Sequence, residues 1–128
     1  MHRFIGIPFN DNEPSLSGAN CYGLVQLFYR EHLGIVIPSL THVHSEHSNR
    51  VWATYLKEIS EHWESVEDPE MFDVVAMAHD MSHPRIVQHI GIYIGEGRVL
   101  HTLNKIGSHI SKLSELKSII RGFHRWQS

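Results

Sequence analysis

The feature of the sequence that most constrains the fold is an alternating segment at residues 89–95. Within it, three isoleucines alternate with Gly91 and Tyr93. Successive side chains of a strand point to opposite faces of a sheet, so this period predicts a strand with one apolar face in the core. Gly95-Glu96-Gly97 is predicted to be a turn, and residues 98–103 are expected to return as the second strand of a hairpin.

The length of this turn decides how two histidines on the strands relate. A two-residue loop would place His89 and His101 on opposite faces of the sheet. A three-residue loop, residues 95–97, would instead pair Gly91 with His101 and set both histidines diagonally on one face, within reach of a polar contact. Three-residue hairpin loops favour glycine at their last, left-handed position, and Gly97 is there. We therefore expect both histidines on one face of the sheet. Gly91, opposite His101, has no side chain that would block their contact.

The rest of the chain places helices before the sheet. Asn20 is a good N-cap, apolar residues follow it at helical spacing, and Gly34 supplies a stop, which predicts a helix between them. The further expected elements are a loop at 6–19, an extended run at 35–38, a helix at about 48–59, strands at 72–77, 106–110 and 122–126, and a helical turn at 114–119. Helices followed by an antiparallel sheet place residues 1–128 in the α+β class as a single domain.

Composition argues against several kinds of function. The chain has 128 residues, a formal charge of −3 and a pI near 6.4, without a cluster of Lys and Arg, so nucleic acid is not expected as a partner. No segment has the apolar length of a membrane span, and the N-terminus lacks the apolar region and cleavage site of a secretory signal. The one cysteine cannot form an internal disulfide, so it is either a small buried residue or a reactive group.

Cys21 is placed for reactivity in the first turn of the predicted helix. The free N–H groups there carry partial positive charge, which should stabilise a thiolate and lower the thiol pKa from about 8.5. The same groups could hold an oxyanion during acyl transfer. Cys21 also shares a helix face with Leu24, Val25 and Phe28, so it should point toward the domain. The alternative is that Cys21 is simply a small buried hydrophobic residue.

Together with the two histidines, Cys21 satisfies the logic of nucleophilic catalysis. A cysteine at a helix N-terminus would be the nucleophile, His89 the general base, and His101 the residue that orients the base. The alternative is that both histidines are ordinary strand residues with local hydrogen bonds. Their predicted place on one face around a glycine favours the catalytic interpretation.

The motifs that carry these residues resemble those of a known family, the NlpC-type cell-wall peptidases of the papain-like superfamily. The Cys and both His match the family pattern residue by residue, as does the spacing between the histidines. The end of the chain resembles the phage-tail branch of that family. The matching stretches are Gly6-Ile7-Pro8-Phe9, Asn20-Cys21-Tyr22-Gly23-Leu24-Val25, His89-Ile90-Gly91-Ile92-Tyr93-Ile94-Gly95, Leu100-His101 and Gly122-Phe123-His124-Arg125.

The resemblance implies a papain-like fold, with N-terminal helices packed on a central antiparallel sheet, and hydrolysis of a peptide bond in the peptidoglycan stem. The bond is commonly that between D-glutamate and diaminopimelate. It also implies no metal or other cofactor and phage tail proteins as partners, whereas the expectation of no nucleic-acid or membrane partner rests on the composition and on the lack of a long apolar segment. Such a protein would be made in the bacterial cytoplasm without a signal peptide and act from a virion tail. Two alternatives stay open: a structural tail component of the same fold with little activity, and a Cys-His amidase or acyltransferase.

Three positions are assigned by the resemblance to the substrate and oxyanion region: Phe9, Asn20 and Tyr22. The family usually has Asp at the position of Asn20, although asparagine caps a helix about as well as aspartate. The family has Tyr at the position of Phe9, which has no hydroxyl to donate to an oxyanion. Removal of one oxyanion donor can cost about 10²-fold or more in rate, so Phe9 predicts reduced activity.

Three other groups of residues have simpler explanations. His42, His44 and His47 could be a metal site, but a solvated loop explains them as well. An acidic stretch is most simply a solvated helix end and loop. The three tryptophans are expected to line either the core or the substrate groove. The acidic residues are Glu58, Glu61, Glu64, Glu67 and Asp68, and the tryptophans are Trp52, Trp63 and Trp126.

Overall fold

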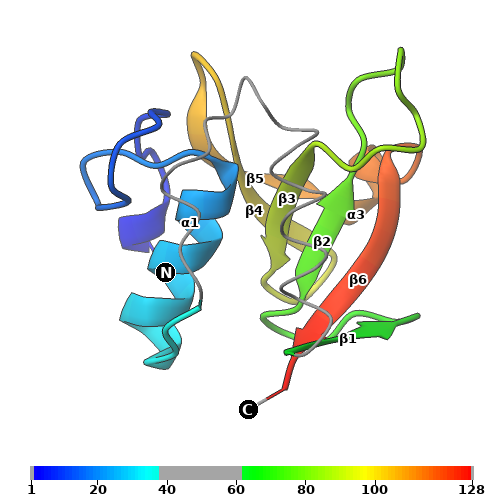
Figure 1. Ribbon diagram of the computed structural model, residues 1–128, viewed down its shortest axis with the longest axis horizontal. Helices are drawn as coiled ribbons and strands as arrows, with labels where there is room; N and C mark the ends of the chain where they lie inside the picture. Colours follow the sequence, from blue (N-terminus) through cyan, green and yellow to red (C-terminus); the bar gives the residue numbers. More distant parts are fainter. Residues whose placement is uncertain (1, 38–61, 128) are drawn as a thin grey trace.

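The computed structural model describes residues 2–37 and 62–127. The predicted helix at 48–59, the group His42, His44 and His47, and Trp52 lie outside the described residues. The helical elements are η1 (His2–Phe4), α1 (Cys21–Phe28), η2 (Tyr29–Leu33) and α3 (Leu113–Leu116). The strands are β1 (Trp63–Val66), β2 (Val74–Met77), β3 (His89–Tyr93), β4 (Arg98–Leu103), β5 (Gly107–Lys112) and β6 (Ile120–Trp126) (Figure 1).

Helix α1 begins where the sequence predicts, and together with η2 it runs to the predicted stop at Gly34. The side chain of Asn20 accepts a hydrogen bond from the backbone N–H of Gly23 at 2.8 Å, which satisfies one of the free donors of the first turn. The helix continues into the wider turn η2 and ends at Gly34, whose φ of 68° is left-handed. Glycine adopts this conformation without steric cost, so it ends a helix readily.

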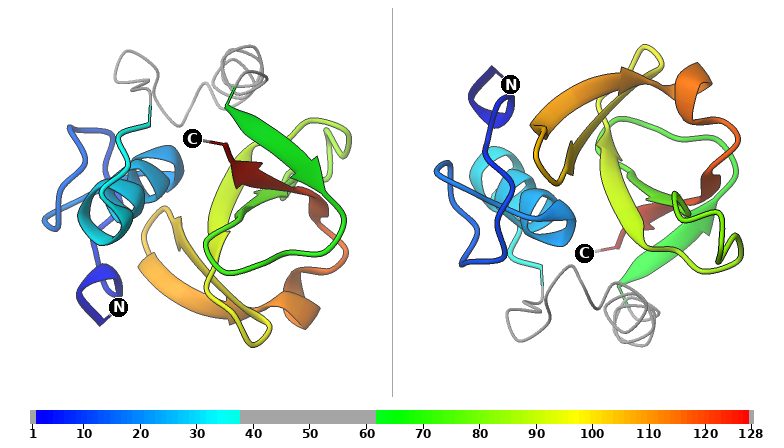
Figure 2. Two further views of the ribbon diagram at one scale, coloured as in Figure 1. Left: turned by 90° about the horizontal axis from the view of Figure 1, so that it is seen from below. Right: turned by 90° about the horizontal axis from the view of Figure 1, so that it is seen from above.

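The strands form one antiparallel sheet in the order β1-β6-β2-β3-β4-β5. The sheet curls strongly, and α1 packs against one side of it (Figure 2). This confirms the α+β class with helices on an antiparallel sheet. Among the described residues, no helix is long and apolar enough to cross a membrane.

The two faces of the sheet bury different sets of side chains. The face toward α1 carries Ile90, Ile92 and Leu100, which pack with the apolar face of the helix in the main core. The opposite face carries a smaller cluster centred on Val75, Met77 and Val99, covered in part by side chains of α3 and β6. Residues 90–94 thus bury their isoleucines against the helix. The alternate residues of β3, which include His89, face the other side of the sheet.

The β3–β4 hairpin has the predicted three-residue loop. Ile92 pairs with Leu100 and Tyr93 with Val99, and the N–H of Ile94 donates to the carbonyl of Arg98 at 3.0 Å. This register continues to Gly91 opposite His101. All three loop residues have positive φ, 86° at Gly95, 53° at Glu96 and 70° at Gly97, so the turn depends on glycine at two of its positions.

The structure corrects the predicted acidic loop. Trp63–Val66, which includes Glu64, forms strand β1 and pairs with β6. The cause is a contact distant in sequence, because Trp63 packs edge-on against Trp126 with ring centroids 5.2 Å apart. Other elements lie within a few residues of their predicted bounds: β2 begins at Val74 and not at 72, β5 extends to Lys112, and β6 begins at Ile120.

Candidate active site

Cys21 and His89 line the same pocket, of about 490 Å³, at the end of the sheet where α1 begins. One wall is the loop that precedes α1, and the other comes from the ends of β3 and β4 and from the segment after β2. The described residues that line it are Phe9, Asn10, Asp11, Cys21, His79, Gln88, His89, Thr102, Leu103 and Asn104. The helix N-terminus and the sheet thus bring a thiol and an imidazole into one cavity.

Cys21 is the first residue of α1 and is half-buried. Burial raises the pKa of its thiol above the ordinary value, and it outweighs hydrogen bonds from the backbone N–H groups of Ile90, Tyr22 and Cys21, which lower it. The expectation of a lowered thiol pKa is therefore wrong for the protein without substrate. The partial positive charge at the helix N-terminus lowers the pKa of the thiol, but the removal of water from around the sulfur raises it by more.

His89 and His101 form a direct hydrogen bond on one face of the sheet, as the loop length predicted. Nε2 of His89 lies 2.8 Å from Nδ1 of His101. Both residues are buried, with 4% of His89 and 3% of His101 exposed. The contact requires Gly91. A Cβ added there would lie 2.9 Å from the carbonyl oxygen of Leu100 and 3.0 Å from Cβ of His101, closer than side chains tolerate.

Both imidazoles are neutral at neutral pH. Burial lowers the pKa of His89 well below its ordinary value, and the nearby His101, His79 and His109 lower it further. Burial, with a smaller effect of His109, lowers the pKa of His101 to about 4. Because Nε2 of His89 is engaged by His101, Nδ1 is the ring nitrogen left for the pocket that His89 shares with Cys21.

The three residues assigned to the substrate region take different places. Phe9 is half-buried and lines the pocket. Asn20 caps α1 with its side-chain oxygen and donates from Nδ2 to Asp11 at 3.0 Å, so it fixes a carboxylate of the pocket wall. Tyr22 is buried in the main core and is not among the described residues that line the pocket.

Sequence reasoning missed several residues of this pocket, among them His79 and Gln88. The ring of His79 meets that of His89 edge-on at 5.4 Å. Gln88 accepts from the N–H of Asp80 at 3.2 Å and donates to the carbonyl of His83 at 2.9 Å, so it closes the loop that carries His79. The pairing of β2 with β3 sets Met77 opposite His89 and so brings the residues after Met77 to the pocket, and no local pattern in the sequence indicates this pairing.

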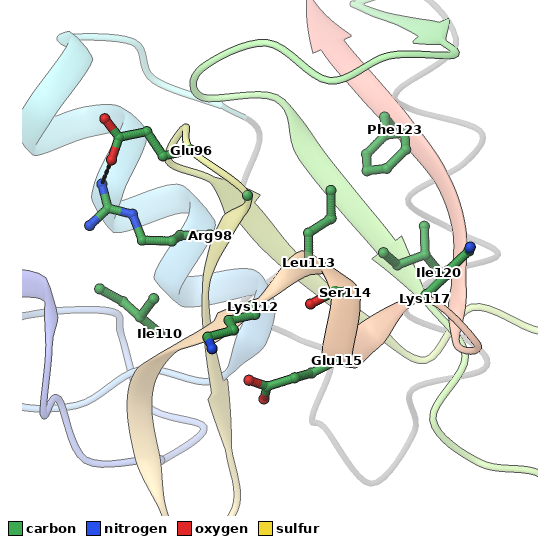
Figure 3. Close-up of a pocket in the computed structure, with 11 residues that line it drawn as sticks. Glu96, Arg98, Ile110, Lys112, Leu113, Ser114, Glu115, Lys117, Ile120 and Phe123 are labelled. Carbon is green, nitrogen blue, oxygen red and sulfur yellow. Dashed lines mark ion pairs between the residues drawn. The ribbon is translucent and has the colours of Figure 1, made fainter.

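A second hollow, of about 1010 Å³, is larger but lies elsewhere, over α3, β6 and the β3–β4 turn (Figure 3). The side chains of Leu113, Ile120 and Phe123 lie on one side of it, and the exposed ion pair between Arg98 and Glu96 lies on the other (Figure 3). The described residues that line it include no Cys or His, so the smaller pocket is the one equipped for nucleophilic chemistry.

Metal ligation was the competing interpretation of His42, His44 and His47. Within residues 2–37 and 62–127, no group of three or more His, Cys, Asp and Glu side chains is arranged to hold a metal ion. His42, His44 and His47 lie outside that part of the chain. The described pocket itself brings together the thiol of Cys21 and the imidazole of His89, which His101 contacts from the next strand.

Solved structures with the same fold carry related names. The NlpC/p60 domain of peptidoglycan hydrolase SagA aligns at a TM-score of 0.62 with 16% identity over 97% of this chain and 91% of that one. An NlpC/P60 family protein from Bacillus cereus gives 0.69 with 24% identity over 98% of this chain, and NlpC2 from Trichomonas vaginalis gives 0.71 with 17% identity over 99%. This chain spans only 37% and 44% of the length of the latter two.

Comparison with curated protein sequences yields no match. At these identities the structural likeness shows the fold alone. The family follows from a protein-family model, which matches most of the chain and includes the positions of the cysteine and both histidines: with residues 6–121 matched, this chain belongs to the NlpC/P60 family.

Proposed function

We propose that this protein is a cysteine peptidase that cleaves peptide bonds of peptidoglycan stem peptides. The observation that carries the proposal is the shared pocket, in which Cys21 begins α1 and His89 is hydrogen-bonded to His101 at 2.8 Å. NlpC/P60 proteins are peptidoglycan hydrolases, and one structure with this fold is named as such a hydrolase. Peptide hydrolysis requires a nucleophile, a base and an orienting group, and these three residues can supply them.

The reaction would begin with a neutral thiol beside a neutral imidazole. Nδ1 of His89 takes the proton from Sγ of Cys21 as Sγ attacks the carbonyl carbon of the scissile bond. The tetrahedral adduct then collapses: the carbon–nitrogen bond breaks, and the imidazolium of His89 gives its proton to the leaving amine. A water molecule, deprotonated by His89, hydrolyses the resulting thioester and restores the thiol.

The start of α1 offers donors for the oxyanion of this adduct. The N–H groups of Cys21 and Tyr22 lie in the first turn, where a helix has no internal partner for them, and both act to lower the pKa of the Cys21 thiol. Such preorganised donors stabilise negative charge that develops next to them. Phe9 in the pocket wall has no hydroxyl to add to them.

One observation favours a second candidate, a structural component of the same fold with little activity. Burial raises the pKa of Cys21, so the population of thiolate at neutral pH is small. The resemblance of Gly122-Phe123-His124-Arg125, which lies within β6, to the phage-tail branch supports a role in a virion tail for either candidate. We propose that the protein is made in the bacterial cytoplasm and acts from that tail, and mass spectrometry of purified virions would test this.

Digestion of purified peptidoglycan tests the activity directly. The wild-type protein is expected to release stem-peptide fragments, identified by mass spectrometry, with new termini at one peptide bond. Cys21→Ala serves as the matched control and should release none. New termini at the bond between sugar and peptide would indicate an amidase, and an acyl group moved onto an added amine would indicate a transferase. The absence of any product with wild-type protein would favour the structural role.

A further inference from the structure

The chain of hydrogen bonds that begins at His89 continues past His101. Nε2 of His101 lies 2.7 Å from Oγ of Ser111. Ser111 is on β5, an edge strand of the sheet, and is half-buried. The register of β4 with β5 places His101 opposite His109, so Ser111 is the diagonal neighbour of His101 on the same face. Three adjacent strands thus contribute one side chain each to a continuous polar chain.

We propose that Ser111 is a positioning residue that fixes the tautomer of His101. Its hydroxyl accepts a hydrogen bond from the Nε2–H of His101. The Nδ1 of His101 then carries no proton and accepts the Nε2–H of His89. The catalytic consequence rests on the proposed function, whereas the tautomer can be measured without any substrate. Ser111 is not among the described residues that line the catalytic pocket, so it acts only through the histidines.

The argument follows from the donors and acceptors of neutral imidazole. A neutral ring has one N–H donor and one bare nitrogen acceptor, so the two contacts of His101 must have opposite polarity. The low pKa of His101, about 4, keeps its ring neutral at neutral pH. If Ser111 accepts from Nε2, then Nδ1 is bare and receives the Nε2–H of His89. Nδ1 of His89 is then also bare, which is the form that can take a proton from Cys21.

The reverse polarity would disable the base. If Nδ1 of His101 carried the proton, it would donate to Nε2 of His89, and the neutral ring of His89 would carry its own proton on Nδ1. That nitrogen could no longer accept the proton of Cys21. Without an acceptor at residue 111, a buried Nε2–H of His101 would lack its partner in this chain, and the disabling tautomer would gain population.

The polarity of the chain can be tested by nitrogen-15 NMR of the histidine rings at pH 7.5, where protonated and bare ring nitrogens have distinct shifts. The wild-type protein should show His101 protonated on Nε2. Ser111→Ala should shift a substantial part of the population to Nδ1, and Ser111→Thr, which keeps the hydroxyl, should restore the wild-type pattern. Ser114→Ala removes a hydroxyl from α3, in the wall of the far hollow (Figure 3), and should change nothing.

The same variants should differ in turnover of a stem-peptide substrate. Ser111→Ala should lower kcat about tenfold, the value of one hydrogen bond, with KM unchanged, and Ser111→Thr should recover most of it. Should Ser111→Ala fail to fold, Ser111→Cys replaces it, because a thiol is a weak acceptor of nearly the same size. The proposal is overturned if Ser111→Ala, folded, keeps both the His101 tautomer and wild-type kcat. If no variant turns over substrate, the wild type included, the proposed function fails while the tautomer measurement still decides the role of Ser111.

Discussion

Two buried polar arrangements in the same sheet differ in charge and in position. Asp73, 2% exposed and just before β2, accepts two hydrogen bonds from the guanidinium of Arg125 on β6, at 3.0 and 2.8 Å. His89, His101 and Ser111 instead form a neutral chain across β3, β4 and β5. The ion pair is outside the pocket that holds Cys21, whereas the histidine chain opens into it.

The difference follows from what each arrangement must do. A buried carboxylate is costly unless it is paired, so the ion pair has one favourable state and fixes β2 against β6. A neutral imidazole can gain or release a proton, and it can do so during a reaction only if its resting state is uncharged. We therefore expect changes to the ion pair to reduce stability and changes to the histidine chain to reduce turnover.

The largest effect is expected from the reactive residues. Cys21→Ala and His89→Ala should each lower turnover of a stem peptide by about 10³-fold or more, because the nucleophile or its base is lost. His83→Ala is the matched control, since His83 is exposed on the neighbouring loop. Thermal midpoints of all three variants should stay close to wild type. Retained turnover in His89→Ala would remove the base from the mechanism.

The ion pair should dominate stability. Arg125→Ala leaves the Asp73 carboxylate buried and without its guanidinium, so the midpoint of thermal unfolding should fall by at least about 5 °C. Asp73→Asn should cost less, because the Arg125 side chain is 30% exposed and water can reach it. Arg98→Ala, which breaks only the exposed pair with Glu96, is the control and should have little effect. Equal losses in Arg125→Ala and Arg98→Ala would contradict the comparison.

Acid should weaken the fold through the histidines. His101 has a pKa of about 4 in the folded protein against about 6.5 when unfolded, so the unfolded chain binds more protons between these values. The free energy of unfolding is therefore unaffected by this group above pH 6.5 and decreases as pH falls from about 6.5 to about 4. The loss reaches on the order of 3 kcal/mol at about pH 4. Burial of His89 acts in the same direction. Urea unfolding from pH 7.5 to 4.5 should show this loss, and His101→Asn should show a shallower one.

The smallest effect is expected at Thr102, which lines the pocket and is 1% exposed. Its hydroxyl has no hydrogen-bond partner among the described residues. Thr102→Val keeps the shape and removes the desolvated hydroxyl, so the free energy of unfolding should rise by about 1 kcal/mol. Thr102→Ser, which keeps the hydroxyl, should not share the gain. Urea unfolding measures both, and a destabilised Thr102→Val would mean that the hydroxyl is bonded in the folded protein.

Local signals predicted the frame of the site and most strands of the sheet. The cap at Asn20 placed Cys21 at the start of a helix, and the glycine turn at 95–97 set the register that brings His89 to His101. Both signals act within a few residues, where backbone conformation decides the outcome. Strand β1 could not be found this way, because Trp63 is held in the sheet by Trp126, far along the chain.

The sequence by itself determined the helix cap, the hairpin register and which of residues 89–95 face the main core. Together these bring the two histidines into contact. Only the tertiary structure decided three other properties: the raised pKa of Cys21, the pocket walls contributed by residues such as His79, and the contact of His101 with Ser111. Each of these depends on how closely distant segments pack and how much water they exclude. Desolvation and cross-strand contacts are set by that packing, which residue order alone does not specify.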